Sequence, residues 1–155
     1  MKTVLDVENT VTKRDGKLHL DPFEIDNKLV MVGILDEFGN EELIRFDDYV
    51  FGRGDVYLKT KIQAILDKTT LLIGHNIAHD LMWIWECGWK YDGKVFDTML
   101  GSYVLQKGNK KPLSLEMCAE RFKLNTQKQD TLKEYFKNGY GVDEIPKEEL
   151  SKYLS

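Results

Sequence analysis

Two acidic side chains near the N-terminus have the types and the spacing to bind a metal ion. Asp6 and Glu8 stand two residues apart in an otherwise apolar segment, so a strand here would project both from one face, about 6.5–7 Å apart. Two carboxylates directed at one spot repel each other and resist burial unless a cation neutralises them. Such hard oxygen ligands favour Mg²⁺ or Mn²⁺ over zinc. The alternative is an edge strand with an acidic, solvated face.

A second group of candidate residues stands where the apolar segment Thr69–Ile73 runs into Gly74-His75-Asn76-Ile77-Ala78-His79-Asp80. The pattern predicts a buried strand followed by a helix, and strand-to-helix turns are where open α/β sheets hold their ligands. Asn76 is expected to cap the helix, and Asp80 stands one turn later on the same face. The alternative is purely structural: a capping amide and an acid that faces the helix dipole.

Other polar residues receive a structural interpretation. His75 and His79 have the i, i+4 spacing that can bind zinc, but no third nitrogen or sulfur ligand stands nearby, so zinc is the weaker hypothesis. Asp97 is expected to cap a helix that begins at Thr98. The basic loop with Lys107, Lys110 and Lys111 is interpreted as solvated rather than as a contact to a phosphate backbone.

The remaining pattern predicts the elements that would position these side chains. Strand patterns cover Thr3–Val7, Lys28–Leu35, Glu42–Phe46 and Thr69–Ile73, with a hairpin turn at Phe38-Gly39-Asn40 and a polar excursion over Thr12–Asn27. Helical patterns cover residues 55–66, Ile77–Glu86, Thr98–Leu105, 115–122, Thr131–Phe136 and Lys147–Leu154. Strands first, and then alternating strands and helices, predict one α/β domain with a mixed sheet flanked by helices.

Composition limits the classes of function. The chain has 155 residues, of which 42% are hydrophobic and 31% charged, which is typical of one folded domain and excludes a disordered chain. The net charge of −4 excludes binding of nucleic acid through overall basicity, but a metal-binding nuclease remains compatible because its carboxylates are acidic. The longest apolar run, Leu29–Leu35, is too short for a membrane span, and no secretory signal precedes Asp6. Two cysteines without a disulfide framework favour a reducing compartment, and we expect the cytoplasm.

The sequence around both groups of acids is similar to a known family. The first motif is Val4-Leu5-Asp6-Val7-Glu8, the second is His75-Asn76-Ile77-Ala78-His79-Asp80, and the segments Phe96–Leu105 and Leu113–Arg121 follow in order. Together they resemble the 3′–5′ proofreading exonuclease domain of bacterial and phage family A DNA polymerases. Those domains belong to the DEDD exonuclease superfamily and have an RNase H-like fold. The segment from Pro22 to Val30 is similar to phage-type members, and the resemblance covers essentially the whole chain.

The family has a third motif, Tyr-x-x-x-Asp, on a late helix. Glu148–Leu154 resembles the approach to it, with Tyr153 as the tyrosine, and the aspartate would fall two residues beyond Ser155. The resemblance therefore implies a single exonuclease domain over residues 1–155 that is truncated before its fourth carboxylate. No His-x-x-x-x-Asp pattern stands near the C-terminus, which favours the tyrosine subclass.

The resemblance implies an enzyme that hydrolyses phosphodiester bonds at the 3′ ends of single-stranded DNA. Two Mg²⁺ or Mn²⁺ ions, about 3.5–4 Å apart, would serve the attacking and the leaving oxygen. Asp6 would bridge both ions, Glu8 would bind the ion on the nucleophile side, and Asp80 would hold the other mainly through water. Tyr153 would orient the attacking water, because a phenol with a pKa near 10 is a poor base at neutral pH.

The resemblance also implies contacts to DNA and to a further domain. Asn76 would support either the 3′ nucleotide or the residues that bind the metal ions. Val7 and Met82 would wedge the terminal bases. The implied partners are a single-stranded DNA 3′ end and a downstream polymerase domain, with no membrane. Lacking the fourth carboxylate, the chain is expected to be weakly active or inactive. Two alternatives remain: an exoribonuclease of the ribonuclease D type, and a catalytically inactive domain that binds nucleic acid or has a structural role.

Overall fold

The computed structural model describes residues 1–46, 56–124 and 131–154. Its elements, in chain order, are β1 (Lys2–Asn9), β2 (Thr12–Arg14), β3 (Lys17–His19), β4 (Leu29–Asp36), β5 (Glu41–Arg45), α1 (Val56–Lys68), β6 (Leu71–Gly74), α2 (Ile77–Glu86), β7 (Lys94–Asp97), α3 (Thr98–Leu105), α4 (Leu115–Arg121), α5 (Thr131–Lys137), the 3₁₀ turn η1 (Val142–Glu144) and α6 (Lys147–Leu154). In these ranges no helix is long and apolar enough to cross a membrane.

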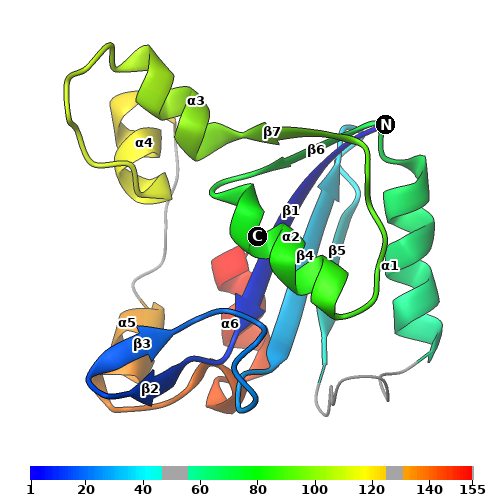
Figure 1. Cartoon of the computed structure of the whole chain (residues 1–155), viewed down its shortest axis with the longest axis vertical. Coiled ribbons are helices and arrows are strands. Elements are labelled where there is room, and N and C mark those ends of the chain that lie inside the picture. The colour runs from blue at the N-terminus through cyan, green and yellow to red at the C-terminus, as the bar shows by residue number, and fades with distance from the viewer. Residues whose placement is uncertain (47–55, 125–130, 155) are drawn as a thin grey trace.

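One mixed sheet organises the molecule (Figure 1). Its five strands run in the order β5-β4-β1-β6-β7, and β2 and β3 form a separate hairpin. β1 pairs antiparallel with β4 and parallel with β6, while β5 and β7 complete the two edges. The predicted class, an α/β domain with a mixed sheet flanked by helices, is confirmed, and the arrangement is consistent with an RNase H-like fold.

Two hydrophobic cores cover opposite faces of the sheet. The main core joins the inward side chains of β1 and β4 to α1 and α2, through residues such as Leu5, Ile62 and Leu81. The smaller core packs Met31 of β4 against η1, α5 and α6. Both cysteines are buried, and neither forms a disulfide among the described residues. β4 is buried over almost its whole length because helices cover it on both faces.

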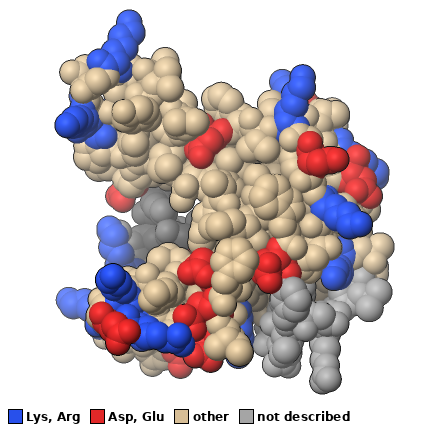
Figure 2. Space-filling model, in the orientation of Figure 1, with Lys and Arg blue, Asp and Glu red and all other residues tan. Residues whose placement is uncertain are grey.

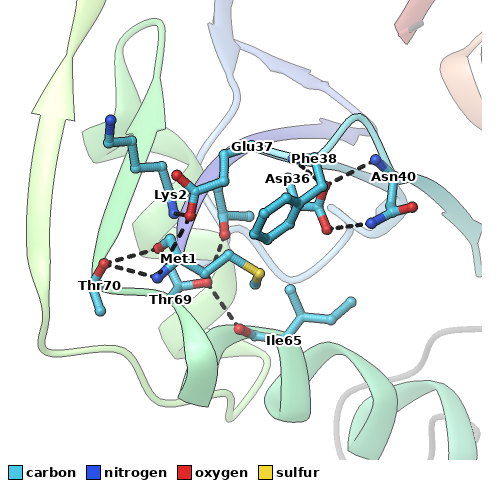
Figure 3. A network of polar contacts seen from close by, with 10 residues as sticks. Met1, Lys2, Asp36, Glu37, Phe38, Asn40, Ile65, Thr69 and Thr70 are labelled. Carbon is cyan, nitrogen blue, oxygen red and sulfur yellow. Dashed lines mark hydrogen bonds and ion pairs between the residues drawn. The ribbon is translucent and has the colours of Figure 1, made fainter.

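The start of β1 is fixed by a polar network around the N-terminus (Figure 3). The Met1 ammonium group donates to the Thr70 hydroxyl at 3.0 Å, and the Thr70 N–H donates to the Met1 carbonyl at 2.8 Å. The Glu37 carboxylate accepts from the backbone N–H of Lys2 at 3.1 Å and lies 3.9 Å from the Met1 ammonium. These contacts fix β1 between its two neighbours, and they therefore also set the position of its acidic residues.

Two elements escaped the prediction from sequence. The polar excursion over Thr12–Asn27 contains the β2–β3 hairpin, whose turn at Asp15-Gly16 has positive φ at both residues, 51° and 74°. An Asp-Gly pair is a strong hairpin signal because both residues tolerate that conformation. The edge strand β7 was also missed, because Lys94, Val95 and Phe96 are exposed and show no alternation.

Candidate active site

Asp6 and Glu8 project from the same face of β1, as their spacing predicts. The strand alternates strictly, with Leu5 and Val7 buried on the opposite side. Asp6 is exposed, whereas Glu8 is half-buried. The residue opposite Asp6 on β4 is Gly33, which has no side chain to cover it. The register of β1 and β4 shifts directly after Glu8, and such bulges are frequent beside active sites because they redirect a side chain.

Asp80 reaches β1 because β6 ends early. β6 pairs with β1 only from Lys2 to Val4, and the chain then turns into α2. The edge of β1 that β6 leaves open is occupied by Asp80, whose Oδ1 accepts a hydrogen bond from the backbone N–H of Val7 at 3.2 Å. Val7 stands between Asp6 and Glu8 in sequence. The fold thus brings the third acid to the strand that carries the other two.

The pKa of Asp80 also indicates that the three acids lie close together. Its side chain is buried, with 3% exposed. Burial, and next the negative charge of Asp6, raise the pKa of Asp80 from 3.8 to about 8, with a smaller contribution from Glu8. The hydrogen bond from Val7 acts in the opposite direction because it favours the carboxylate. Asp80 is therefore largely protonated at neutral pH unless a cation offsets its surroundings.

The donor chemistry of the three carboxylates fits a hard divalent cation. Asp6, Glu8 and Asp80 offer only oxygen ligands, and a positive charge among them would relieve the repulsion that raises the pKa of Asp80. Within the described ranges, no three His, Cys, Asp or Glu side chains are arranged to hold one ion together. A cation would therefore have to draw the three carboxylates inward.

The predicted capping role of Asn76 is wrong. Asn76 stands at the N-cap position of α2, but its backbone is left-handed, with φ 65° and ψ 44°, and its side chain makes no capping hydrogen bond. The sharp turn from β6 into α2 requires this conformation, which asparagine tolerates better than most residues. The side chain is exposed, and it lies one turn before Asp80.

Asp97 caps α3, as predicted, and it also accepts a hydrogen bond from the backbone of Asn76. Its Oδ1 accepts from the N–H groups of Met99 and Leu100 at 2.8 and 3.2 Å, which caps α3. The same oxygen accepts from the backbone N–H of Asn76 at 3.0 Å. One carboxylate therefore joins the beginnings of α2 and α3, a link that no sequence pattern indicated.

The two histidines of the second motif make separate structural contacts. His75 lies between the hydroxyl of Thr98 at 2.9 Å and the carbonyl of Leu113 at 2.6 Å. His79 contacts the side-chain oxygen of Asn9 at 3.0 Å, and burial lowers the pKa of its ring while Asp21 partly offsets this. Both rings therefore tie α2 or the segment before it to neighbouring elements.

The remaining predicted site residues differ in their placement. The Val7 side chain is only 6% exposed and lies in the main core, so the expectation that it wedges a base is wrong: strand alternation turns it away from the acidic face. Met82 is half-buried on α2.

Tyr153 belongs to the last turn of α6, and its side chain lies outside the described part. α6 itself lies on the acidic face of β1, because Leu150 packs with Met31, the partner of Glu8.

Fold and site together define an α/β domain with three acids gathered at one strand. No protein-family model and no curated protein matches the sequence. The fold is similar to a solved structure, the family B DNA polymerase from the hyperthermophilic archaeon Pyrobaculum calidifontis, with a TM-score of 0.60 and 18% sequence identity. The match covers 99% of this chain and 22% of that polymerase. At this identity the likeness concerns the fold alone.

Proposed function

We propose that this chain is a metal-dependent 3′–5′ exonuclease domain that hydrolyses phosphodiester bonds at the 3′ ends of single-stranded DNA. The observation that carries the proposal is the hydrogen bond from Val7 to Asp80, which brings the second-motif acid to the strand of Asp6 and Glu8. The order of the motifs and the similarity of the fold to a DNA polymerase support it. Family A, the tyrosine subclass and a polymerase domain as partner belong to the same proposal.

Asp6, Glu8 and Asp80 are the residues that would hold two Mg²⁺ or Mn²⁺ ions. Such ions would activate water and stabilise the charge that develops on the phosphate. The N–H of Val7 restrains one oxygen of Asp80, and the carboxylate retains further lone pairs that can bind a cation. Asp80 must lose its proton to bind a cation, because its pKa lies near 8.

The organic part of the substrate would be handled by residues around these carboxylates. The exposed amide of Asn76 stands at the turn before α2 and can donate to, or accept from, the terminal nucleotide. Met82 offers a partly exposed apolar surface on α2. Tyr153 is assigned the orientation of the attacking water, because α6 lies on the face that carries Asp6 and Glu8.

The decisive experiment follows the degradation of 5′-labelled single-stranded DNA in the presence of Mn²⁺. The wild-type chain should shorten the strand from its 3′ end at a low rate, as expected of a weakly active chain. Asp80→Asn should lower that rate at least about 10²-fold, since even the loss of a group that supports a metal ligand typically costs 10–100-fold. Asp26→Asn is the matched control, because Asp26 is exposed and remote in sequence from the motifs. Equal rates for both variants would contradict the proposal.

The same assay separates the alternatives. Faster degradation of RNA than of DNA of the same sequence would favour an exoribonuclease of the ribonuclease D type. Binding of the strand without any degradation, by wild type and Asp80→Asn alike, would favour an inactive nucleic-acid-binding domain. A strand that is shortened from its 5′ end, or cut internally, would exclude all three assignments.

A further inference from the structure

Charge is distributed unevenly between one lobe and the rest of the chain. We define the α3–α4 lobe as residues 94–124, which comprise β7, α3, α4 and their connections. The lobe has six Lys and Arg residues and three Asp and Glu residues. The whole chain, by contrast, has 22 Lys and Arg residues and 26 Asp and Glu residues. In Figure 2, Lys and Arg side chains lie at the outer edges of this lobe, at the upper left. A basic lobe on an acidic chain is the electrostatic pattern of a polyanion-binding surface.

A cavity of about 140 Å³ lies in this lobe, between the end of α3, the turn after it and α4. None of its seven lining residues is acidic. Five of them can donate a hydrogen bond, namely Ser102, Gln106, Asn109, Lys111 and Arg121. Ser102 and Gln106 are both more than nine-tenths buried. We call this cavity the lobe pocket.

The arginine of the lobe pocket lacks an acceptor. Nη2 of Arg121 donates to the carbonyl of Pro112, but Nη1 is buried and has no hydrogen-bond partner among the described residues. A buried N–H of a charged group is unfavourable unless an acceptor meets it. A guanidinium group presents its donors as a planar fork, which matches the oxygens of a phosphate.

Lys111 is held at the edge of the same pocket by its backbone. The side-chain oxygen of Gln106 accepts from the Lys111 N–H at 2.9 Å, and the Gln106 amide donates to the Lys111 carbonyl at 3.2 Å. This double contact fixes the backbone of Lys111 at the edge of the lobe pocket. In the part of the chain that the structure describes, no carboxylate pairs with Lys111 or Arg121. The lobe pocket thus has an excess of donors, two of them cationic.

The lobe is tied rigidly to the candidate active site. Asp97 joins the beginning of α3 to the backbone of Asn76, and His75 contacts both Thr98 and the segment before α4. Exposed aromatic side chains, including Tyr103 and Phe96, lie on the same lobe at 57% and 51% exposure. Aromatic surfaces beside cationic groups are typical of proteins that bind single strands.

We propose that the lobe pocket binds a backbone phosphate of a single nucleic-acid strand whose 3′ end enters the carboxylate site. This inference rests on the proposed function, because it places one strand across both features. Arg121 and Lys111 contact the phosphate oxygens, and the buried amide of Gln106 keeps Lys111 in position. The lobe pocket therefore adds affinity for a strand that extends beyond its terminal nucleotides.

Binding is measured by fluorescence anisotropy of a short 5′-labelled oligothymidylate in EDTA, with Asp80→Asn as the parent protein so that no strand is degraded. Adding Lys111→Gln should weaken binding about 3- to 10-fold and reduce the slope of log affinity against log salt by about 0.7, the value for one lost phosphate contact. Lys68→Gln removes the same charge from the exposed end of α1 and should change affinity less than twofold. Equal effects of the two variants would overturn the proposal.

Arg121 is tested by two substitutions, because its contact to Pro112 also supports the fold. Arg121→Lys keeps the charge but loses the fork, and Arg121→Gln loses both, so affinity should fall in that order while thermal melts confirm folding. Inorganic phosphate at constant ionic strength should not displace the strand; full displacement would overturn the proposal in favour of a site for free phosphate. Lys111→Gln carries the decision even if both Arg121 variants fail to fold.

The assay of strand degradation distinguishes failure of this inference from failure of the proposed function. In the Asp80 wild-type background, Lys111→Gln should raise KM for a long strand and leave kcat, and the cleavage of a dinucleotide, unchanged. If Lys111→Gln leaves strand degradation unchanged, the proposal for the lobe pocket is contradicted, whereas the proposed exonuclease function is supported. If Lys111→Gln weakens binding but the wild-type chain degrades no strand, the proposal for the lobe pocket is supported and the proposed exonuclease function is contradicted.

Discussion

The backbone N–H of Val7 donates to the carboxylate of Asp80, 73 residues further along the chain. The contact exists because β6 stops pairing with β1 at Val4 and leaves the next part of the β1 edge to α2. It satisfies a backbone donor that would otherwise be buried without an acceptor. It also fixes an acid beside two others, so the same hydrogen bond has a structural and an electrostatic consequence.

The raised pKa of Asp80 makes stability depend on pH. The unfolded chain releases this proton near pH 3.8, whereas the folded chain keeps it to about pH 8, so stability falls as pH rises between these values. Asp80→Asn removes the titration while its amide oxygen still accepts from Val7. We expect the free energy of unfolding of the variant to exceed that of the wild type at pH 8 by on the order of 5 kcal/mol, and the difference to vanish near pH 4.

Urea unfolding at a series of pH values measures this difference. Asp26→Asn is the control, because it makes the same substitution at an exposed residue. Parallel stability profiles for the wild type and Asp80→Asn would show that Asp80 is ionised in the folded chain.

A divalent cation should stabilise the fold, because it binds the gathered carboxylates of the native state and not the dispersed ones of the unfolded state. Thermal melts of the wild type should therefore shift upward with Mn²⁺ or Mg²⁺. The shift should grow from pH 6 to pH 8, since Asp80 must lose its proton to bind the ion.

The control for the cation effect is a variant that lacks both β1 acids. Asp6→Ala combined with Glu8→Ala should show no shift, whereas Glu41→Gln, an exposed acid on the edge strand β5, should behave as the wild type. An equal shift in all three proteins would mean that the ions bind elsewhere.

Elements with strong periodicity and clear end signals were predictable from sequence. The bounds of α2, α3 and α6 agree with the prediction residue for residue, because each has an apolar periodicity and a polar or proline residue at its beginning. The alternation of β1 likewise predicted the shared face of Asp6 and Glu8. These features depend on local chemistry alone.

Features that depend on neighbouring elements were not predictable. β7 is a strand because β6 provides a partner, and its own residues show no pattern. The left-handed backbone of Asn76 and the burial of Asp80 follow from where β6 ends relative to β1. In α4, Leu115 and Phe122 are about half exposed although their spacing predicted one buried face, because α4 packs mainly through Cys118 and Ala119.

Asp97 should matter for stability and for the site together. Asp97→Ala removes the acceptor of three N–H groups, those of Met99, Leu100 and Asn76. The loss of a helix cap typically costs about 1–2 kcal/mol, and the freed turn at Asn76 should lower the rate of strand degradation as well. Ser114→Ala is the control, because it removes a cap of the same kind from α4, where the Ser114 hydroxyl accepts from the N–H of Met117.

Both variants are compared by urea unfolding and by the degradation of labelled DNA. Asp97→Ala should lose activity beyond what its stability explains, and Asp97→Asn should recover part of it, since an amide oxygen still accepts. If Ser114→Ala loses as much activity at the same stability, the link between α2 and α3 has no special role.

Arg45 should hold α6 on the acidic face of the sheet. From the edge strand β5, its guanidinium donates to the carbonyl of Ile145 at 2.5 Å and to that of Asp143 at 2.8 Å, at the turn that leads into α6. Hydrogen bonds from a charged donor contribute about 1.5–3 kcal/mol. Arg45→Met should therefore weaken the docking of α6, and Arg45→Lys, which can reach only one carbonyl at a time, should weaken it less.

Hydrogen exchange distinguishes this local effect from general unfolding. In Arg45→Met the amides of α6 should exchange faster while those of β1 and α2 keep their protection, and the rate of strand degradation should fall because Tyr153 is carried by α6. Arg14→Met is the control, since Arg14 pairs with Glu24 at 2.8 Å within the excursion after β1. Unchanged exchange of α6 in Arg45→Met would show that the smaller core, through Leu150 and Ile145, holds the helix without the arginine.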